Sequence, residues 1–526
     1  MKIKRVFLLF TISIITANIF LSVFLFSTPA VQASALIPTF SLTIIANTYG
    51  DEGIFNFELA TLADQVPTTV ENLNLETVVR TIRRTFSDLP ADQAYRLLTN
   101  DPRGWIFSNG SCFGQGSFIF SPLPYGMDIT PQAGAEIFCY FNFTHLAPEA
   151  EPSGKRPVLI VPGIPGTEIL KDQNKLWLDL GRMFTDIGDQ FMDPLQLNQD
   201  LSPSVADLSL GDVIRKVQIN IGIGKISVFD YIFGLVEEFK GQGYVENQNL
   251  FTFPYDWRYG ITGRNEQNLT NVDLLKLKID EVLAKTHFKK IDIVAHSQGG
   301  VLVKKYVMDN TNHRIDKAVF VGVPNTGSPS SVKILLQGDN LNILGLSDAE
   351  IKKISQNMPA IYDLSPSQTY YNRKGSFVRV IEQNGLSTIY RDLDYDQTRS
   401  YLLGDHNLNN TAYNNAQALH TSAFDDFDPR AVGVDMHNIV GCKAGTLGKV
   451  LENRLTGETT IPSFDLFPQL TPGDGTVPLE SATNLPVDAD KRFFALKADH
   501  GKMLSQNGIR QKIVNIIAGS SMVAPD

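Results

Sequence analysis

The sequence predicts an α/β fold with a doubly wound parallel sheet, preceded by a small all-β sandwich. The chain has 526 residues, of which 43% are hydrophobic, enough for more than one domain and a large core. Across residues 158–526, short apolar runs alternate with helical patterns, which favours a sheet covered by helices. Residues 36–146 instead show only short strand patterns separated by turns, which is typical of a β-sandwich.

The first 35 residues are predicted to form an export signal. Three basic residues lie within the first five positions, an apolar run covers residues 6–26, and small residues around Ala33 and Ala35 provide cleavage sites. Because the apolar run is long enough to cross a bilayer, an uncleaved N-terminal anchor is the alternative. Either way, the sequence predicts a secreted or cell-surface protein.

The β-sandwich is predicted over residues 36–146, with residues 147–157 as a linker rich in Pro, Glu and Ala. The strand patterns lie at residues 41–46, 54–59, 104–107, 117–120 and 135–141. The chain has three cysteines, which cannot all pair, and spacing alone does not establish the connectivity. We expect a Cys112–Cys139 disulfide, since these residues flank one short stretch, and a buried Cys442.

The larger domain is predicted to alternate strands and helices, with two inserted segments. Strand patterns occur at residues 158–161, 250–253, 291–294, 317–321, 377–381, 438–440 and 493–496, and helical patterns at 230–240, 272–285 and 301–308. The insertions lie near residues 176–225 and 325–429, and we expect them to form a cap or lid at the carboxyl edge of the sheet. Apolar residues between Leu180 and Met192 predict a lipid-facing lid or a core-packed cap helix, and periodicity favours the packed helix.

A nucleophilic serine is predicted at Ser297. The sequence AHSQGG at residues 295–300 separates a buried strand pattern from a helical pattern, with the serine at the apex of the turn. This is the context of a nucleophile elbow, in which small neighbours permit the tight turn. The following helix directs backbone N–H groups toward the charge that develops when the serine attacks a carbonyl. For this segment alone, a chance small-x-Ser-x-Gly turn is the alternative.

An acid and a histidine follow Ser297 in the chain order that a catalytic triad on this fold requires. Asp474 lies in a glycine-flanked loop, and His500 follows the last strand pattern. We expect His500 to take the proton of Ser297 while Asp474 orients the second ring nitrogen. The competing candidates are His296, His437, Asp465 and Asp499. His296 is disfavoured because it precedes the nucleophile, and Asp499 because neighbouring residues rarely orient each other's rings.

The oxyanion hole is predicted in the loop after residues 158–161. Residues 162–167 read PGIPGT, and Pro165 has no N–H to donate. The expected donors are therefore the backbone N–H groups of Ile164 and Gln298. Two such donors stabilise a tetrahedral intermediate by several kcal/mol.

Several motifs together resemble the lecithin:cholesterol acyltransferase family of α/β-hydrolases, which includes lysosomal phospholipase A2-type enzymes and bacterial lipases. The motifs are PVLIVPGIPGTEIL, LWLDLGRMF, GYVENQNLFTFPYDWR, IDIVAHSQGG, VGVPNTGSP, NMPAIYDLSP and GDGTVPLESA. The resemblance implies Ser297, Asp474 and His500 as the triad, Ile164 and Gln298 as oxyanion donors, and a substrate-binding role for Trp177. It requires no metal or cofactor. Residues 36–146 resemble prealbumin-like repeats of bacterial surface proteins, which implies a spacer or adhesive module.

Charge and composition restrict the partners. The formal net charge of −10 argues against nucleic acid and against strong electrostatic docking on an anionic membrane. No CxxC motif or His/Cys cluster suggests zinc, so we expect no metal. Asp256 and Arg258 are expected to brace a strand end as an ion pair, and Asp425 and Asp426 to lie in a solvated loop.

The sequence therefore predicts an exported, serine-dependent lipid acyl-ester hydrolase or O-acyltransferase that works through an acyl-serine intermediate. Its expected partner is a lipid or other acyl ester, with at most transient contact with a membrane or cell surface. The alternative is a non-catalytic cell-surface protein that retains the fold and uses residues 36–146 for binding. The sequence does not determine whether water or an alcohol accepts the acyl group.

Overall fold

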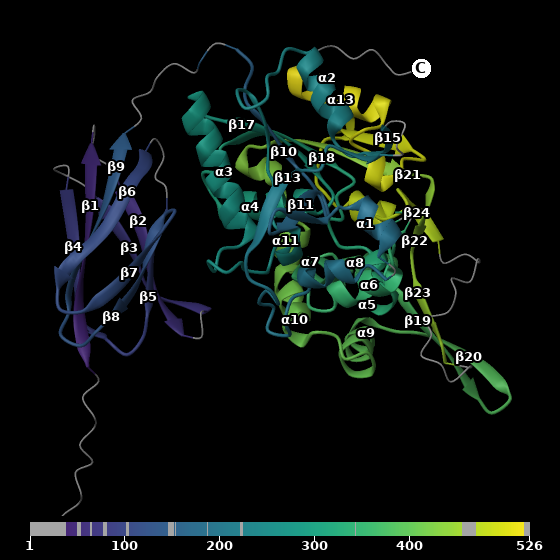
Figure 1. Cartoon of the computed structure of the whole chain (residues 1–526), viewed down its shortest axis with the longest axis horizontal. Coiled ribbons are helices and arrows are strands. Elements are labelled where there is room, and N and C mark those ends of the chain that lie inside the picture. The colour runs from purple at the N-terminus through teal and green to yellow at the C-terminus, as the bar shows by residue number, and fades with distance from the viewer. Residues whose placement is uncertain are drawn as a thin grey trace, which may run out of the picture.

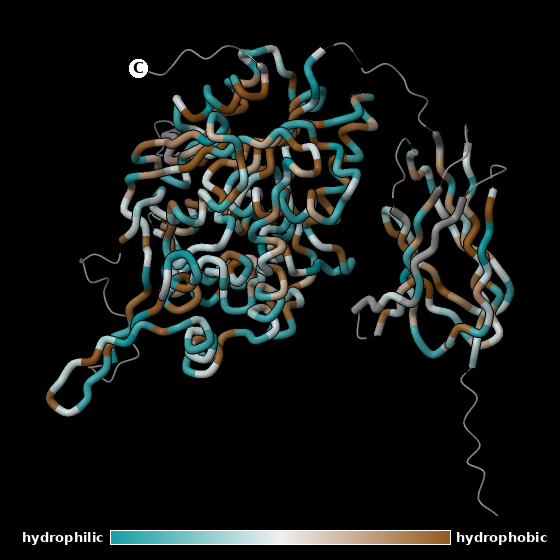
Figure 2. Tube along the Cα trace, turned by 180° about the vertical axis from the view of Figure 1, so that it is seen from behind, coloured by the Kyte–Doolittle hydropathy of each residue, from teal (hydrophilic) through white to brown (hydrophobic). Residues whose placement is uncertain are grey.

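The computed structural model describes residues 38–49, 54–63, 66–76, 81–100, 105–145, 152, 154–186, 188–220, 225–341, 343, 345–454 and 470–519. They form an all-β body and a larger α/β body (Figure 1). Apolar segments run through the inside of both bodies (Figure 2). The predicted signal segment, residues 1–35, lies outside the described residues, as does most of the predicted linker.

The N-terminal body is a β-sandwich of two sheets, in the strand orders β4-β1-β9-β6 and β3-β2-β5-β8-β7. Alternate residues such as Leu42, Ile44 and Phe141 point inward and are fully buried between the sheets. Cys112 and Cys139 face each other on neighbouring strands and form a disulfide. The strands are β1 (Thr39–Tyr49), β2 (Ile54–Ala63), β3 (Val66–Glu76), β4 (Thr81–Pro90), β5 (Tyr95–Asn100), β6 (Trp105–Gln115), β7 (Phe118–Leu123), β8 (Gly126–Pro131) and β9 (Glu136–His145).

The described part of the larger body is organised around a six-stranded parallel sheet in the order β16-β10-β17-β18-β21-β25. The strands are β10 (Val158–Val161), β16 (Leu250–Thr252), β17 (Ile291–His296), β18 (Ile315–Val321), β21 (Asp435–Cys442) and β25 (Arg492–Leu496). Every residue of β10 and β17 is buried. This burial explains their continuous apolar sequences, because helices cover both faces of such a sheet.

Four helices flank this sheet. They are α2 (Phe233–Gly241), α3 (Asn271–Thr286), α4 (Gln298–Asp309) and α13 (Asn507–Ala518). Helix α2 packs against α13 and α3 packs against α4, and the two pairs lie on different sides of the sheet (Figure 1). This arrangement is the α/β-hydrolase fold. No helix among the described residues is long and apolar enough to cross a membrane.

The first insertion forms a small antiparallel sheet, short helices and a hairpin. Its elements are β11 (Thr167–Lys171), β12 (Asn174–Trp177), α1 (Leu180–Thr185), the 3₁₀ helix η1 (Gln190–Leu195), β13 (Leu208–Val213), β14 (Lys216–Asn220) and β15 (Lys225–Asp230). Leu180, Met183 and Met192 are buried in the core of the larger body, whereas Phe184 is 48% exposed. The apolar repeat therefore forms mainly a packed cap, as its periodicity favoured.

The second insertion is mostly helical. It contains α5 (Pro329–Gln337), α6 (Asp348–Ser355), α7 (Pro359–Tyr362), α8 (Gln368–Lys374), β19 (Val378–Asn384), β20 (Ser387–Asp392), α9 (Tyr395–Ser400), η3 (Tyr401–Asp405), α10 (Asn410–Leu419), α11 (Ser422–Asp425) and η4 (Pro429–Val432). The strand predicted at residues 377–381 exists but does not join the central sheet. It pairs instead with β20 and β23 (Val450–Asn453), and the resulting hairpin projects from the body (Figure 1).

The remaining elements lie outside the central sheet and the two insertions. They are η2 (Trp257–Tyr259), β22 (Ala444–Leu447), β24 (Leu470–Gly473), α12 (Leu479–Ala482), η6 (Ala489–Lys491) and η7 (His500–Lys502). The two bodies meet at α3, where the Tyr125 hydroxyl of the sandwich donates a hydrogen bond to Asp280. The ammonium of Lys276 lies 3.5 Å from the centre of the Tyr125 ring.

Candidate active site

Ser297 occupies a strained turn between β17 and α4. Its φ of 53° and ψ of −128° place a residue with a side chain in a region that favours glycine. Such strain is characteristic of a nucleophile elbow, where it lifts the hydroxyl above the sheet edge. Neighbouring glycines make this turn possible: a Cβ on Gly299 would lie 2.5 Å from the Pro162 carbonyl oxygen, and one on Gly300 would lie 2.2 Å from Val323 Cγ2.

The structure brings the three residues predicted as a triad together, with His500 within hydrogen-bonding distance of both Ser297 and Asp474. His500 Nε2 is 2.9 Å from Ser297 Oγ, and His500 Nδ1 is 2.8 Å from Asp474 Oδ2. The side chains come from three separate loops, after β17, after β24 and after β25. Because β17 and β25 are parallel strands of one sheet, the loops that follow them meet at one edge.

Asp474 is held rigidly for its contact with His500. Its second carboxylate oxygen, Oδ1, accepts hydrogen bonds from the backbone N–H groups of Thr476 (3.0 Å) and Val477 (2.7 Å). The His500 backbone N–H also donates to the Asp474 carbonyl oxygen at 3.0 Å, which joins the two loops. Gly441 is required behind the acid, because an added Cβ would lie 2.3 Å from Asp474 Cβ.

The environment of His500 favours its protonated form. Burial works against the imidazolium, but the attraction and hydrogen bond from Asp474 outweigh it and raise the pKa of His500 above its usual value. A smaller contribution in the same direction comes from the charge of Asp499. The Asp474 carboxylate therefore stabilises the imidazolium form of His500.

The loop that contains Ile164 lies directly against the elbow. A Cβ on Gly163 would be 2.5 Å from Ser297 Cβ, so only glycine permits this approach. Within the described residues, neither the Ile164 N–H nor the Gln298 N–H donates to a protein acceptor. A free N–H group is what the predicted role of both residues as oxyanion donors requires.

The side-chain amide of Gln298 is held by two hydrogen bonds, one from Tyr255 and one to the Ala360 backbone. Tyr255 Oη lies 2.9 Å from the Pro162 carbonyl oxygen and 3.3 Å from Gln298 Oε1. Gln298 Nε2 donates to the Ala360 carbonyl oxygen at 3.2 Å, which connects the elbow to α7 of the second insertion. The sequence did not single out Tyr255 by itself, although it belongs to the YDWR block.

Trp177 lies beside the loop at residues 162–167 that is predicted to form the oxyanion hole, called the oxyanion loop below. Its indole N–H donates to the Pro165 carbonyl oxygen at 2.7 Å, and its ring makes an edge contact with Trp257 at 5.8 Å between centroids. Only 2% of the residue is exposed. These contacts brace the oxyanion loop, and a substrate-binding role for Trp177 stays a prediction.

The competing candidates are engaged elsewhere. Asp499 caps η7 through the Gly501 N–H and pairs with Lys502. His437 lies 3.2 Å from Asp435 at the start of β21, and Asp465 lies outside the described residues. His296 does not contact Ser297 through its ring nitrogens; instead its ring packs against His500, with 4.8 Å between centroids.

Two expectations about charged pairs have different outcomes. The brace between Asp256 and Arg258 is confirmed, with Nη2 of the 2%-exposed arginine 2.6 Å from Oδ2. The solvated loop predicted for Asp425 is wrong, because its side chain is fully buried, 2.7 Å from His420 Nδ1. Although burial opposes both charges, this contact raises the pKa of His420 and lowers that of Asp425. Asp426 is half-exposed, as expected.

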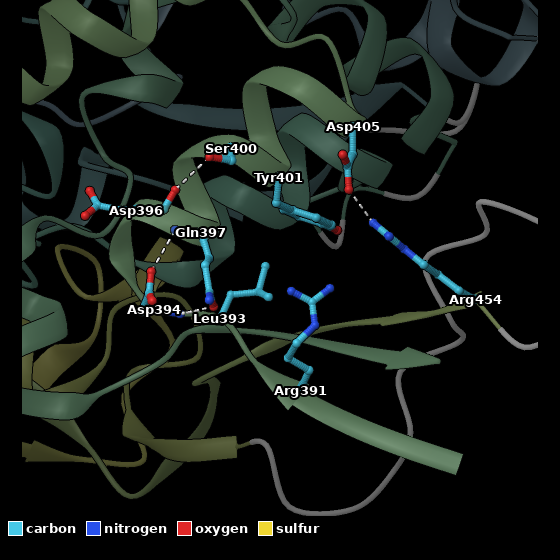
Figure 3. A pocket seen from close by; sticks show the side chains of 9 residues that line it. All are labelled: Arg391, Leu393, Asp394, Asp396, Gln397, Ser400, Tyr401, Asp405 and Arg454. Atoms are coloured by element: carbon cyan, nitrogen blue, oxygen red, sulfur yellow. Dashed lines mark hydrogen bonds and ion pairs between the residues drawn. The ribbon is translucent and has the colours of Figure 1, made fainter. Parts of the chain in front are cut away.

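Outside the triad, the described residues offer few alternative sites. They contain no group of three or more His, Cys, Asp or Glu side chains that could hold a metal ion. A polar surface pocket of about 380 Å³ lies in the second insertion (Figure 3). Three aspartates and two arginines line it, and Arg454 and Asp405 form an ion pair at 2.6 Å. Its lining residues are Arg391, Leu393, Asp394, Asp396, Gln397, Ser400, Tyr401, Asp405 and Arg454.

Comparison with known sequences identifies the family. The profile described as lecithin:cholesterol acyltransferase matches residues 175–451, more than half of the chain. Phosphatidylcholine-sterol acyltransferase of Mus musculus is 26% identical over 242 residues, which cover 40% of this chain and 53% of the relative. Lysosomal phospholipase A and acyltransferase of Bos taurus is 25% identical over 280 residues, covering 48% and 68%. The chain spans about half the length of the sterol acyltransferases it matches.

Among solved structures, a Bacillus licheniformis lipase, BlEst2, covers 70% of this chain and 92% of its own, with 12% identity and a TM-score of 0.31. The family match includes Ser297 but ends before Asp474 and His500. The positions of Asp474 and His500 beside Ser297 are therefore known from the structure and not from the family match. On the strength of that match, the chain belongs to the lecithin:cholesterol acyltransferase family of α/β-hydrolases.

Proposed function

We propose that this protein is a serine-dependent lipid acyl-ester hydrolase or O-acyltransferase. The observation that carries the proposal is the continuous hydrogen-bonded line from Asp474 through His500 to Ser297, beside two unused backbone N–H groups. Family membership supports a lipid ester as the substrate. No metal or cofactor takes part in the proposed chemistry.

In the acylation half-reaction, His500 Nε2 takes the hydroxyl proton of Ser297 as Oγ attacks the ester carbonyl carbon. The carbonyl π electrons move onto the oxygen, which the N–H groups of Ile164 and Gln298 stabilise. His500 then returns the proton to the leaving alkoxide as the ester C–O bond breaks. The leaving group departs as an alcohol, and the acyl group remains on Ser297.

In the deacylation half-reaction, water or an alcohol attacks the acyl-serine. His500 accepts a proton from this nucleophile and gives it back to Ser297 Oγ when the acyl–serine bond breaks. Water gives a free fatty acid, and an alcohol gives a new ester. We favour hydrolysis as the default outcome, since water is always present.

We further propose that the chain consists of a signal segment at residues 1–35, a sandwich at 36–146, a linker at 147–157 and a catalytic domain at 158–526. Export would follow from the basic and apolar pattern at the N-terminus. The Cys112–Cys139 disulfide supports an oxidising location, where such bonds persist.

The test is an acyl-release assay with phosphatidylcholine vesicles and with a short-chain chromogenic ester, each with and without a long-chain alcohol. Wild-type protein should release acyl groups, whereas Ser297→Ala should lose roughly 10⁴-fold or more of the activity. Ser121→Ala, an exposed substitution in the sandwich, serves as the matched control and should retain full activity. Folded wild-type protein with no activity on any ester would instead support the non-catalytic binding protein.

A further inference from the structure

A line of hydrogen bonds runs behind the triad and joins the oxyanion loop to the histidine loop. The backbone N–H of Gly163 donates to Tyr231 Oη at 2.8 Å. Tyr231 Oη lies 3.0 Å from His296 Nδ1, and His296 Nε2 lies 3.0 Å from the backbone carbonyl oxygen of His500. Tyr231 follows β15 directly, so three loops distant in the sequence are connected.

The direction of each hydrogen bond follows from the groups at the two ends. The His500 carbonyl oxygen can only accept, so His296 Nε2 must carry a proton. A neutral His296 then has an acceptor at Nδ1, which accepts a hydrogen bond from the Tyr231 hydroxyl. Tyr231 Oη in turn accepts from the Gly163 N–H. Every donor in this line therefore has one matching acceptor.

Both side chains are held in the protonation states that this line requires. Tyr231 is 6% exposed and His296 is 3% exposed. Burial raises the pKa of Tyr231, which keeps its hydroxyl proton in place. Burial, and then the nearby charge of His500, holds the pKa of His296 well below its usual value. His296 thus stays neutral when His500 becomes an imidazolium during the proposed reaction.

The two ends of the line are the two parts of the site that must not move relative to Ser297. Gly163 precedes Ile164, whose N–H is a proposed oxyanion donor, and the next residue, Pro165, has no N–H. By accepting a hydrogen bond from the Gly163 N–H, Tyr231 fixes the orientation of the Pro162–Gly163 peptide. The neighbouring Ile164 N–H is then left for the substrate. At the other end, His296 holds the backbone of His500, whose ring must stay within reach of Ser297.

We propose that Tyr231 and His296 act together as positioning residues. Their hydrogen bonds form a structural relay, in which no proton is transferred, and this relay keeps the oxyanion loop and the general base at fixed positions relative to Ser297. Neither residue touches the reacting atoms. The relay rests on the proposed esterase function, and it assigns a specific role to the histidine that immediately precedes the nucleophile. A displacement of about 1 Å in such a site costs on the order of 10²-fold in rate.

The experiment compares wild-type protein with Tyr231→Phe, His296→Gln, His296→Leu and the double variant of Tyr231→Phe with His296→Leu. Tyr306→Phe is the matched control, because Tyr306 is also buried and its hydroxyl also makes a hydrogen bond to the protein, donating to the His313 carbonyl oxygen at 2.9 Å. For each protein, kcat and KM on a soluble chromogenic ester and the melting temperature are measured. His296→Gln keeps a side-chain N–H that can reach the His500 carbonyl oxygen.

The relay predicts that Tyr231→Phe lowers kcat roughly 10- to 100-fold with less than a threefold change in KM, while its melting temperature matches that of Tyr306→Phe. Because the two residues share one line, the double variant should lose no more than about the larger single loss. His296→Gln should retain more activity than His296→Leu. Equal kcat values for Tyr231→Phe and Tyr306→Phe, or losses that multiply in the double variant, would overturn the relay.

The same measurements separate the relay from the proposed function. If wild-type protein hydrolyses the ester and Ser297→Ala does not, the proposed function is supported. The kinetics of the Tyr231 and His296 variants then test the relay alone. If wild-type protein is inactive although folded, the proposed function fails first, and the relay fails with it.

Discussion

Asp474 and His500 are joined by two hydrogen bonds, one between side chains and one between backbones. Nδ1 of His500 lies 2.8 Å from Oδ2 of Asp474, and the His500 backbone N–H donates to the Asp474 carbonyl oxygen at 3.0 Å. These contacts hold the ring so that its second nitrogen, Nε2, lies 2.9 Å from Ser297 Oγ.

The first prediction concerns this pair and the pH dependence of activity. A general base must be neutral, so kcat/KM should rise with pH through the pKa of His500. Because Asp474 raises that pKa, the midpoint of the rise should lie above pH 6.5. In Asp474→Asn the attraction is lost, so the midpoint should move to lower pH, while the plateau falls about 10⁴-fold.

Asp499→Asn is the control for that profile. The charge of Asp499 contributes least to the raised pKa of His500, so the midpoint should shift slightly in the same direction with kcat retained. A profile of Asp474→Asn with an unchanged midpoint would contradict the assigned role of the acid.

A second prediction concerns the close approach of the oxyanion loop to the nucleophile. Gly163→Ala should lower kcat by roughly 10²-fold, because the new Cβ would lie 2.5 Å from Ser297 Cβ and must push the loop away. Gly241→Ala at the end of α2 meets no atom within 4 Å and should leave kcat unchanged. Steady-state kinetics on a soluble ester checks both variants.

The third prediction concerns the buried ion pair of the YDWR block. Asp256→Asn leaves the Arg258 guanidinium, which is 2% exposed, without its charge partner. The free energy of unfolding of the catalytic domain should fall by about 3 kcal/mol. Disrupting the exposed pair of Arg379 and Asp392 with Arg379→Gln should cost less than about 1 kcal/mol. Denaturant unfolding followed by tryptophan fluorescence compares the two, and equal losses would contradict the bracing role.

A fourth prediction concerns the disulfide. Cys112 and Cys139 are 27 positions apart, so loss of their bond should destabilise the sandwich by about 3–4 kcal/mol through the entropy of the unfolded chain. Differential scanning calorimetry with and without a reductant should show one transition moving to lower temperature. A second transition, that of the catalytic domain, should not move, because its described cysteine, Cys442, is unpaired.

The site could be predicted from the sequence where its residues belong to local patterns. The elbow around Ser297 is set by a buried strand, small residues and a helix start, all within a dozen positions. The parallel sheet then brings the loops of Asp474 and His500 to the same edge, which chain order alone indicates for this fold. Ile164 is predicted as an oxyanion donor because Pro165 has no N–H, and this role stays a prediction.

Other features depend on contacts between distant segments and could not be predicted in this way. Nothing near Tyr231 in the sequence indicates that its hydroxyl would meet Gly163 and His296. Asp425 looked solvated because a neighbouring acid is common in surface loops, and only the packing of His420 against it explains its burial. Residues 377–381 have a strand pattern, but no local signal distinguishes a strand of the central sheet from one in an insertion.

The central claim is that Ser297 is the nucleophile of an esterase, and covalent labelling tests it most directly. Native protein is treated with a serine-reactive alkyl phosphonate, and the modified peptide is identified by mass spectrometry. The account predicts a single adduct on Ser297, formed much more slowly in His500→Ala. Folded protein that gains no adduct, or gains one on a different serine, would contradict the account.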